Sequence, residues 1–377
     1  MIYDGHVYCV PDQRGRMGYT TREEFMGHLQ YGMAVNFQPA WRARDGAPAD
    51  SYGMYDPTIG TGRAALLECD FRPAGYGRYE WTVDGEDFVR QVMPPTNIIN
   101  RYTAEQLVAE MDHADVDWGM VHRSTYLGIG NEWVANCVRR FPDRLHGLAH
   151  VEEWLIQSQP DAAIAKIETA IKDLGLHGIQ WLAGSVRSYG QTEAGDSEGF
   201  LPFWDAVAGL GIPVFFTTSP GSDASKTTGS MLENYVEDMN TLRRWMERYP
   251  DVKVVVTHGL PFREFMEEDR VEMPQAVMDA IPADNPNYNV QILFVNALGG
   301  DYDYPAPQTK PVLEQMARQI GADRLMWGTD IPQNLRHYTY RQSHEAISRY
   351  CEDILSKTEI DQVLGGNMAR LMGLERA

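Results

Sequence analysis

Short apolar runs alternate with amphipathic segments along most of the chain. Seven runs follow residue 100, and an opening run ends at Pro11. Their richness in Val, Ile, Leu and Phe is typical of parallel strands that are buried on both faces. The runs after residue 100 are 118–124, 146–151, 178–182, 212–219, 252–259, 289–299 and 324–332. Since helical patterns separate the runs, as in consecutive βα units, we predict one (β/α)₈ barrel domain over residues 1–377.

Two of the helical segments carry clear local signals. Thr103 is followed three residues later by Gln106, the spacing of a capping box, so a helix is expected to begin there. The segment 160–175 carries an apolar stripe at helical spacing, which predicts a face packed on the sheet. The stripe consists of Ile164, Ile167, Ile171 and Leu174.

The first connection departs from the repeat, because residues 9–100 separate the opening strand from its expected helix. The segment is rich in Gly, Tyr, Trp, Pro and Arg and contains strand-like runs at 64–71 and 77–83. A structureless loop of this length is unusual, so we predict an inserted β-containing subdomain. Loops that follow barrel strands rise from the carboxyl-terminal face, so the insertion is expected over the barrel mouth as a lid or oligomer contact.

The charge balance narrows the choice of partners. The 377 residues include 53 acidic and 33 basic side chains, giving a net charge of −20, which disfavours nucleic acid and anionic membranes. No apolar run of membrane-spanning length and no signal-peptide pattern is found, so a cytoplasmic protein is expected. The four cysteines lack metal or disulfide spacing. The aromatic insertion favours a homo-oligomer, a dimer or higher.

Functional side chains of such a barrel come from the carboxyl-terminal strand ends. The last residues of the predicted strands are mostly polar, and they form the set of candidate site residues. In chain order it includes His6, Tyr8, His122, Arg123, Ser124, His150, Glu152, Glu153, Gln180, Trp181, Thr217, Thr218, Ser219, His258, Asn296 and Asp330.

Three short motifs occur at strand ends in a specific order. They are D-x-H at 4–6, T-H-G at 257–259 and G-T-D-x-P at 328–332. Supporting stretches are RFPDRLHGLAHV, DAVAGLGIPVFF, YPDVKVVVTHGLPF and VLGGNMARLMGL. Together they resemble the amidohydrolase superfamily, in particular the amidohydrolase-related branch with aminocarboxymuconate semialdehyde decarboxylase and γ-resorcylate decarboxylase. The resemblance covers most of the barrel.

The resemblance implies a metal set in which His6 and Asp330 are ligands and His258 hydrogen-bonds the attacking water. Two positions differ from the family pattern, because Tyr8 replaces the second ligand of strand 1 and Thr217 or Thr218 replaces a histidine. Neutral hydroxyl groups are poor ligands for Zn²⁺ or Mn²⁺. No cofactor is therefore firmly predicted, and the alternative is a single divalent ion, Zn²⁺ or Mn²⁺, on His6, His258 and Asp330.

Without a firm metal, the strand ends still supply acid–base chemistry. Asp330 and His258 are suited to deprotonate water, and His6 or Tyr8 to assist the oxygen that gains charge. Arg123, helped by Arg72 or Arg78 of the insertion, is placed to hold an anionic substituent. The further predicted substrate contacts are Thr217, Thr218, His150 and Trp181.

Three functions follow, and the hydrolase ranks above the decarboxylase because decarboxylation depends more on a metal. The first is a hydrolase that attacks a small cyclic or heterocyclic substrate by lactone opening, amide cleavage or displacement of a ring leaving group. The second is a metal-dependent, non-oxidative decarboxylase of an aromatic or muconate-type acid. The third is a barrel without catalysis that serves as a binding or assembly protein.

Overall fold

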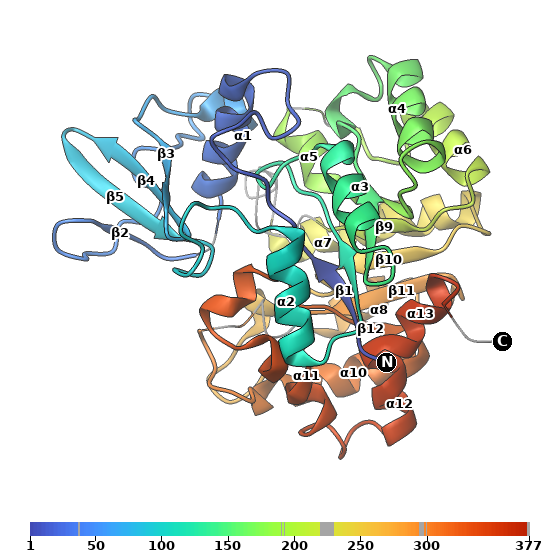
Figure 1. Cartoon of the computed structure of the whole chain (residues 1–377). Coiled ribbons are helices and arrows are strands. Elements are labelled where there is room, and N and C mark those ends of the chain that lie inside the picture. The colour runs from blue at the N-terminus through green and yellow to red at the C-terminus, as the bar shows by residue number, and fades with distance from the viewer. Residues whose placement is uncertain are drawn as a thin grey trace.

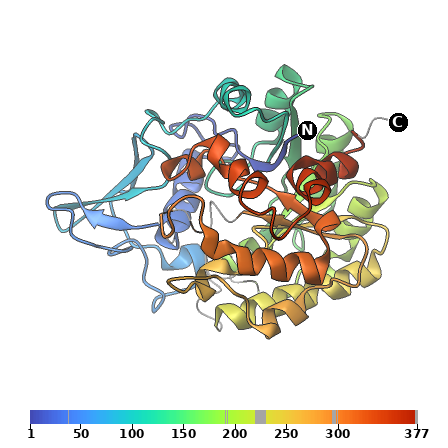
Figure 2. The ribbon, with the colours of Figure 1, turned by 90° about the horizontal axis from the view of Figure 1, so that it is seen from below.

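The computed structural model describes residues 1–36, 38–189, 191, 193–218, 230–293, 298 and 300–374. Within these residues, eight parallel strands form one sheet that curls into a barrel surrounded by helices (Figures 1 and 2). In sheet order the strands are β1 Tyr3–Val7, β6 Trp118–Val121, β7 Leu145–Ala149, β8 Gly178–Leu182, β9 Val214–Thr217, β10 Val254–Thr257, β11 Tyr288–Ile292 and β12 Leu325–Trp327. The predicted (β/α)₈ barrel is confirmed.

The barrel closes between its first and last strands through residues that follow β12. Asp330 donates its main-chain N–H to the carbonyl of His6 at 2.8 Å, and Tyr8 donates to the carbonyl of Ile331 at 2.9 Å. These bonds bring the ends of β1 and β12 side by side. The closure therefore places two predicted site residues next to each other.

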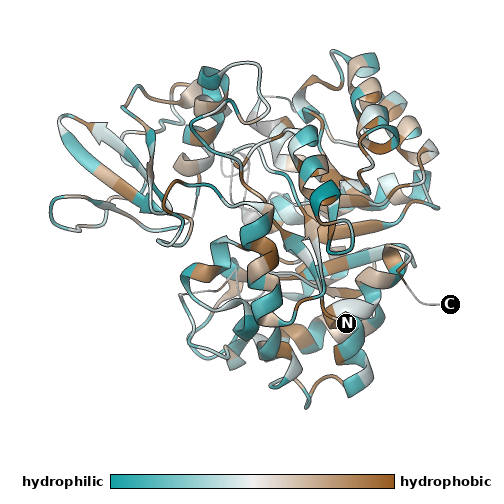
Figure 3. Cartoon of the chain, in the orientation of Figure 1, coloured by the Kyte–Doolittle hydropathy of each residue, from teal (hydrophilic) through white to brown (hydrophobic). Residues whose placement is uncertain are grey.

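Helices follow each strand and cover the outside of the barrel. Those between strands are α2 Ala104–Ala114, α3 Asn131–Arg140, α4 Pro160–Lys172, α5 Ala183–Ser188, α6 Leu201–Gly209, α7 Met231–Arg248, α8 Gln275–Ala280 and α10 Lys310–Ile320. After β12 come α11 Tyr340–Ser348, α12 Lys357–Asp361 and α13 Asn367–Leu371. Hydrophobic segments gather on strands such as β10, and hydrophilic ones lie on many outer helix turns (Figure 3).

The local helix signals are largely reproduced. Thr103 and Gln106 form the predicted capping box at the start of α2. In α4 the buried face is shifted slightly, because it is centred on Ala163, Ile167 and Ala170. The flanking residues Ile164 and Ile171 are only partly buried against the core.

The insertion at 9–100 folds as a helix and a small antiparallel sheet beside the barrel (Figure 1). The helix is α1 Arg22–Ala34, and the sheet contains β2 Ala40–Arg42, β5 Glu86–Gln91, β4 Arg78–Val83 and β3 Arg72–Gly75 in that order. The predicted strand at 77–83 corresponds to β4. The predicted strand at 64–71 is wrong, because its first residues end a 3₁₀ helix, Gly62–Ala65.

Several loops at the carboxyl-terminal ends of the strands contact the insertion. Tyr189 lies in the chain after β8, and its hydroxyl accepts a hydrogen bond from the Arg63 guanidinium at 2.9 Å. The Arg336 guanidinium, beyond β12, donates to the carbonyl of Gln91 at 3.3 Å. The insertion thus contacts the loops after β8 and β12, and its role as a lid or oligomer contact stays a prediction.

Among the described helices, none combines the length and the apolar character that crossing a membrane requires.

Candidate functional site

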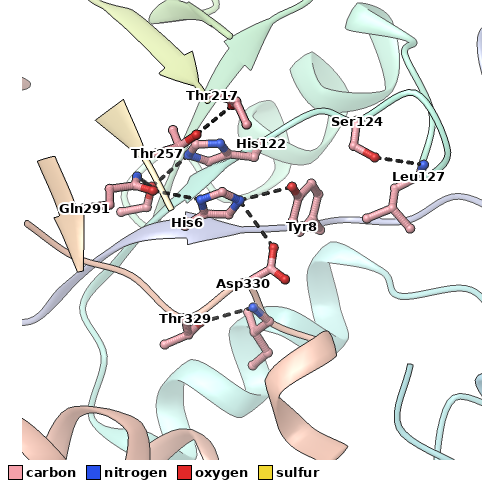
Figure 4. A network of polar contacts seen from close by, with 12 residues as sticks. His6, Tyr8, His122, Ser124, Leu127, Thr217, Thr257, Gln291, Thr329 and Asp330 are labelled. Atoms are coloured by element: carbon pink, nitrogen blue, oxygen red, sulfur yellow. Dashed lines mark hydrogen bonds and ion pairs between the residues drawn. The ribbon is translucent and has the colours of Figure 1, made fainter. Parts of the chain in front are cut away.

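His6 is the centre of a buried polar network at the end of β1 (Figure 4). Its Nδ1 lies 2.8 Å from Oε1 of Gln291, and its Nε2 lies 3.0 Å from the hydroxyl of Tyr8. The same Nε2 lies 3.4 Å from Oδ1 of Asp330. Figure 4 shows the imidazole between Gln291 on one side and Tyr8 and Asp330 on the other.

The contacts of Gln291 assign the tautomer of His6. The amide nitrogen of Gln291 donates to the carbonyl of Gly5 at 2.6 Å, so its oxygen faces His6 Nδ1 as an acceptor. Burial, followed by the neighbouring His122 and His258, lowers the pKa of His6 well below its usual range. The neutral ring therefore carries its proton on Nδ1 and presents a lone pair at Nε2.

This tautomer determines what fits between His6 and Asp330. Nε2 has no proton to donate, so it accepts the hydroxyl of Tyr8 at 3.0 Å and faces the Asp330 carboxylate, a second acceptor, at 3.4 Å. Such a pair is stabilised by a group that brings positive charge or N–H and O–H donors between the two atoms. Either a water molecule that donates to both atoms or a cation bound between them satisfies this requirement.

His122, at the end of β6, stacks on His6 with ring centroids 3.7 Å apart and an interplanar angle of 9°. Its Nε2 donates to the carbonyl of Gly5 at 2.8 Å. Burial lowers the pKa of His122 to about 3. This second neutral ring fixes the plane of His6 from one side.

His258 and Asp330 complete the group that the sequence predicted. Both residues lie just after a strand, and the backbone of each is in the left-handed region, with φ of 61°. That conformation is costly for residues other than glycine and is often found at functional sites. One ligand atom each from His6, His258 and Asp330 lies within 4.8 Å of the others. Burial lowers the pKa of His258 to about 4.

Two glycines allow the backbone to make this site. Gly259 also has positive φ, and a Cβ there would lie 2.5 Å from the carbonyl oxygen of Gln291. A Cβ on Gly328 would lie 3.0 Å from Cβ of His6. The glycines of the T-H-G and G-T-D motifs thus permit the close approach of neighbouring strands.

Threonine hydroxyls line the wall at β9 and β10. Thr257 donates to the hydroxyl of Thr217 at 2.6 Å, and the Gln180 amide donates to the same hydroxyl at 3.3 Å. Figure 4 shows Thr217 and Thr257 near the stacked His122 ring. Thr218 is the next residue along the chain and is buried.

The structure does not bring every predicted substrate contact to this group. Arg123 is fully buried and donates to the main-chain carbonyls of His122, Gly128 and Cys9 at 2.9, 3.0 and 3.4 Å. Its guanidinium therefore holds the loop that follows β6.

Trp181 and Arg72 lie further from the group. The Trp181 ring packs on Phe200 and Trp204 in the helix layer, while its neighbour Gln180 contacts Thr217. Arg72 forms ion pairs with three acidic residues of the insertion, at distances of 3.0 to 3.4 Å. Trp181 packs under the helices because successive strand residues point to opposite faces.

His150 sits with Glu153 in a second buried polar group at the end of β7. Both side chains are fully buried, and His150 Nδ1 lies 3.9 Å from Oε1 of Glu153. Burial lowers the pKa of His150 and raises that of Glu153. Ser219 and Asn296, which the sequence also indicated, lie outside the described residues.

Sequence reasoning missed Gln291. A polar residue inside the apolar strand β11 was the available signal, because a fully buried amide requires partners. It also missed Arg336, which lies in a turn beyond β12, and Tyr126, which lies in the loop after β6.

The donor set also fits a divalent metal ion. Two imidazoles and one carboxylate form a ligand set that holds catalytic divalent ions with open positions for water or substrate. The lone pair of His6 Nε2 faces the Asp330 carboxylate, as required of two ligands to one ion. The three residues that would hold the ion are therefore His6, His258 and Asp330.

Comparison with known proteins defines the class. The family model described as amidohydrolase matches residues 85–374, so the chain belongs to the amidohydrolase family. The matched range begins inside the insertion and leaves out β1 with His6. No curated protein sequence matches the chain.

Solved structures share the fold at low sequence identity. A probable 2-pyrone-4,6-dicarboxylic acid hydrolase from Acinetobacter baumannii is 18% identical, with a TM-score of 0.52 over 72% of this chain and 90% of that chain. The 2,6-dihydroxybenzoate decarboxylase from Rhizobium is 17% identical, with a TM-score of 0.52 over 72% and 88%. A dihydroxybenzoic acid decarboxylase from Polaromonas with bound manganese is 17% identical, with a TM-score of 0.50 over 72% and 86%.

Proposed function

We propose that the protein is a hydrolase of small cyclic or heterocyclic substrates, in which Asp330 and His258 activate the attacking water. The observation that carries this proposal is the convergence of His6, His258 and Asp330 around one point, with their ligand atoms within 4.8 Å. The lone pair of His6 and the Asp330 carboxylate together form a receptor for the protons of a water molecule.

In the proposed reaction, Asp330 or His258 accepts a proton from water as the water oxygen forms a bond to the electrophilic ring or carbonyl carbon. The electron pair of the broken bond goes to the leaving oxygen or nitrogen, which takes up the proton, or to a halide, which leaves as the anion while the proton passes to solvent. Burial keeps His258 neutral near pH 7, so its imidazole is available as a base. The Tyr8 hydroxyl lies 3.0 Å from His6 Nε2, and we assign to it the hydrogen bond to the oxygen that gains charge.

A divalent ion is compatible with this chemistry. His6, His258 and Asp330 would hold it, and Gln291 would orient His6 through Nδ1. When bound, such an ion lowers the pKa of water and polarises carbonyl oxygens.

The second candidate is non-oxidative decarboxylation of an aromatic acid. The three-residue donor set supports it, because a bound ion would hold the substrate carboxylate. Two of the structural neighbours are named as dihydroxybenzoate decarboxylases, one with bound manganese. Hydrolysis ranks first because it also proceeds with the protein's own bases.

The test is an activity screen in water enriched in ¹⁸O. Lactones, cyclic amides, halogenated heterocycles and phenolic acids are incubated with enzyme that has been treated with a chelator, and with enzyme resupplied with Zn²⁺ or Mn²⁺. Hydrolysis places ¹⁸O in the product, whereas decarboxylation releases CO₂ without ¹⁸O in the ring product. We expect ¹⁸O incorporation that Asp330→Asn abolishes and Asp353→Asn, at an exposed ion pair with Lys310, leaves unchanged. CO₂ release as the sole reaction overturns the first candidate.

A further inference from the structure

Thr217, the last residue of β9, faces the inside of the barrel. Phe215 and Val255 lie in an apolar cluster to which β1, β6, β7, β9, β10 and β12 all contribute, so both side chains point toward the barrel axis. Alternate residues of a strand point to the same side, so Thr217 and Thr257, two residues further along, do so as well. The His122 ring lies edge-on to Phe215, with ring centroids 5.4 Å apart. The two threonines therefore line the barrel interior beside the His122 ring, as Figure 4 shows.

The hydroxyl of Thr217 contacts two polar neighbours. Its oxygen lies 2.6 Å from that of Thr257, its partner in the strand register, and 3.3 Å from Nε2 of Gln180. The main-chain N–H of Arg123 donates to Oε1 of Gln180 at 2.6 Å. This bond fixes the orientation of the amide, because the oxygen takes the acceptor position. Gln180 therefore presents an N–H donor to Thr217.

Burial assigns the direction of the hydrogen bond between the two threonines. Thr257 is fully buried, and its hydroxyl has no second partner in the described part of the chain. If Thr217 were the donor, the proton of Thr257 would be buried without an acceptor, which is costly. Thr257 is therefore the donor, and Thr217 accepts from both neighbours.

One hydrogen-bonding group of Thr217 is left unused. A hydroxyl has two acceptor lone pairs and one proton, and here Thr257 and Gln180 take both lone pairs. No described residue accepts the remaining proton. Thr217 is partly exposed, unlike Thr257, and its O–H bond points away from both neighbours. Thr217 thus offers a fixed O–H donor to a ligand inside the barrel.

Both neighbours of this hydroxyl are held beside histidines of the site. Thr257 immediately precedes His258. The Gln180 amide is bonded to the main-chain N–H that follows His122, and the His122 ring stacks on His6 with ring centroids 3.7 Å apart. The free donor therefore lies on the wall between two histidines that belong to the candidate site.

We propose that the Thr217 hydroxyl donates to the carbonyl oxygen of a lactone or cyclic amide substrate, with Thr257 and Gln180 as positioning residues. The inference rests on the proposed function and adds a specificity-determining residue to it. The hydrogen bond strengthens as the oxygen gains negative charge during attack by water, when Tyr8 supplies a second donor. Tyr8 must first leave His6 Nε2, to which its hydroxyl donates at 3.0 Å, whereas Thr217 gives up no existing hydrogen bond. Ring carbonyl compounds are thereby preferred over halogenated heterocycles that lack this oxygen.

Binding of a matched pair of ligands tests this hydrogen bond separately from turnover. 2-Piperidone and 2-piperidinethione differ only in the acceptor atom, and sulfur is the weaker acceptor. Both are titrated calorimetrically, and the infrared carbonyl band of ¹³C-labelled 2-piperidone is recorded on the protein. The variants are Thr217→Val, which keeps the shape but loses the hydroxyl, Thr217→Ser, which keeps the hydroxyl, and Thr257→Val, which removes only the donor to Thr217. The control is Thr358→Val on the exposed side of α12.

We expect the wild type to bind 2-piperidone about threefold or more tightly than its thione, with the carbonyl band at lower wavenumber than in Thr217→Val. Thr217→Val loses the preference, Thr217→Ser keeps most of it, and Thr358→Val keeps all of it. Thr257→Val keeps part of it, because the proton of Thr217 remains. A wild type without this preference overturns the inference, as does a folded Thr217→Val protein that keeps both the preference and the band position. A Thr257→Val protein that loses as much as Thr217→Val overturns it too, because the hydrogen bond then runs in the opposite direction.

Turnover separates this inference from the proposed function. On a lactone or cyclic amide that is hydrolysed in the ¹⁸O screen, Thr217→Val lowers kcat/KM by about 100-fold, and Thr217→Ser recovers most of that loss. Hydrolysis with unchanged kcat/KM in Thr217→Val overturns the inference alone. A carbonyl preference without hydrolysis of any substrate overturns the proposed function alone.

Discussion

Thr329 donates its hydroxyl to Oδ2 of Asp4 at 2.5 Å, and this contact joins the first strand of the barrel to the residues after the last. Oδ1 of the same carboxyl group accepts the N–H groups of His6 at 2.9 Å and Thr329 at 3.1 Å. The Tyr340 hydroxyl donates to Oδ2 at 2.8 Å. The fully buried Asp4 therefore holds the main chain at His6 and immediately before Asp330.

Thr329→Val should loosen this junction. The substitution keeps the shape of the side chain but removes a hydroxyl that donates to Asp4 and accepts from the N–H of Ile331 at 3.2 Å. We expect the free energy of unfolding in urea to fall by about 1–3 kcal/mol. Thr358→Val on the exposed side of α12 is the control and should change it by less than about 0.5 kcal/mol. Equal stability of the two variants would show that the junction is not formed.

Gln291→Leu should reduce turnover more than stability. The variant removes the acceptor that holds His6 Nδ1, so the imidazole is free to rotate or change tautomer. Loss of such an orienting partner typically costs about 10- to 100-fold in activity or metal affinity. Gln291→Glu keeps an acceptor and should recover part of kcat.

Gln315→Leu is the matched control for Gln291, because its amide also uses both its oxygen and its nitrogen, here on the main-chain N–H and carbonyl of Met273 at 2.9 and 3.1 Å. That variant should lose stability but not kcat. Steady-state kinetics and thermal unfolding on the same preparations separate the two effects. A Gln291→Leu enzyme with normal kcat would contradict the assigned role.

Much of the fold could be predicted from the sequence because each barrel strand is a compact apolar run. The insertion was harder to interpret. Helix α1 buries His28 and contains Gly27 and Gly32 beside its apolar positions, so its periodicity is obscured. The run at 64–71 has strand-like composition, yet its first residues end a 3₁₀ helix, Gly62–Ala65, which contacts α1.

The candidate site could be predicted as far as strand ends determine it. His6, His258 and Asp330 come together because strand ends of one barrel meet at one face. The choice between Gln180 and Trp181 depends on a register of one residue, which composition does not determine. Arg336 and Tyr126 lie after β12 and β6, outside the strands, and the sequence contains no periodic signal for such positions.

Gly32→Ala should disturb the contact between the insertion and the barrel. A Cβ at this position would lie 2.9 Å from the ring of Tyr126, so α1 or the ring must shift. We expect lower stability, although alanine favours helices by about 1 kcal/mol over glycine. The matched control is Gly209→Ala at the end of α6, where a Cβ meets nothing within 4 Å. It should be neutral or stabilising, and a stabilised Gly32→Ala protein would show that α1 does not press on Tyr126.

The burial of His28 should make the docking of the insertion sensitive to acid. His28 is 3% exposed, stacks on Tyr19 at 4.5 Å and lies 3.2 Å from Nη1 of Arg63. Burial, and then Arg63, lower its pKa to about 3, against about 6.5 in the unfolded chain. Between these values the unfolded chain binds more protons, so stability is complete above about pH 6.5 and falls as the pH is lowered toward 3.

His28→Gln removes this titration and so isolates its contribution. From about pH 7 to about pH 5, we expect the wild type to lose about 2 kcal/mol more unfolding free energy than the variant does. Urea unfolding followed by tryptophan fluorescence at the two pH values measures the difference. His113→Gln, at an exposed position on α2, should behave like the wild type. If the two histidine variants show the same pH dependence, then His28 is not held neutral by burial, and its contacts with Tyr19 and Arg63 are looser than the structure places them.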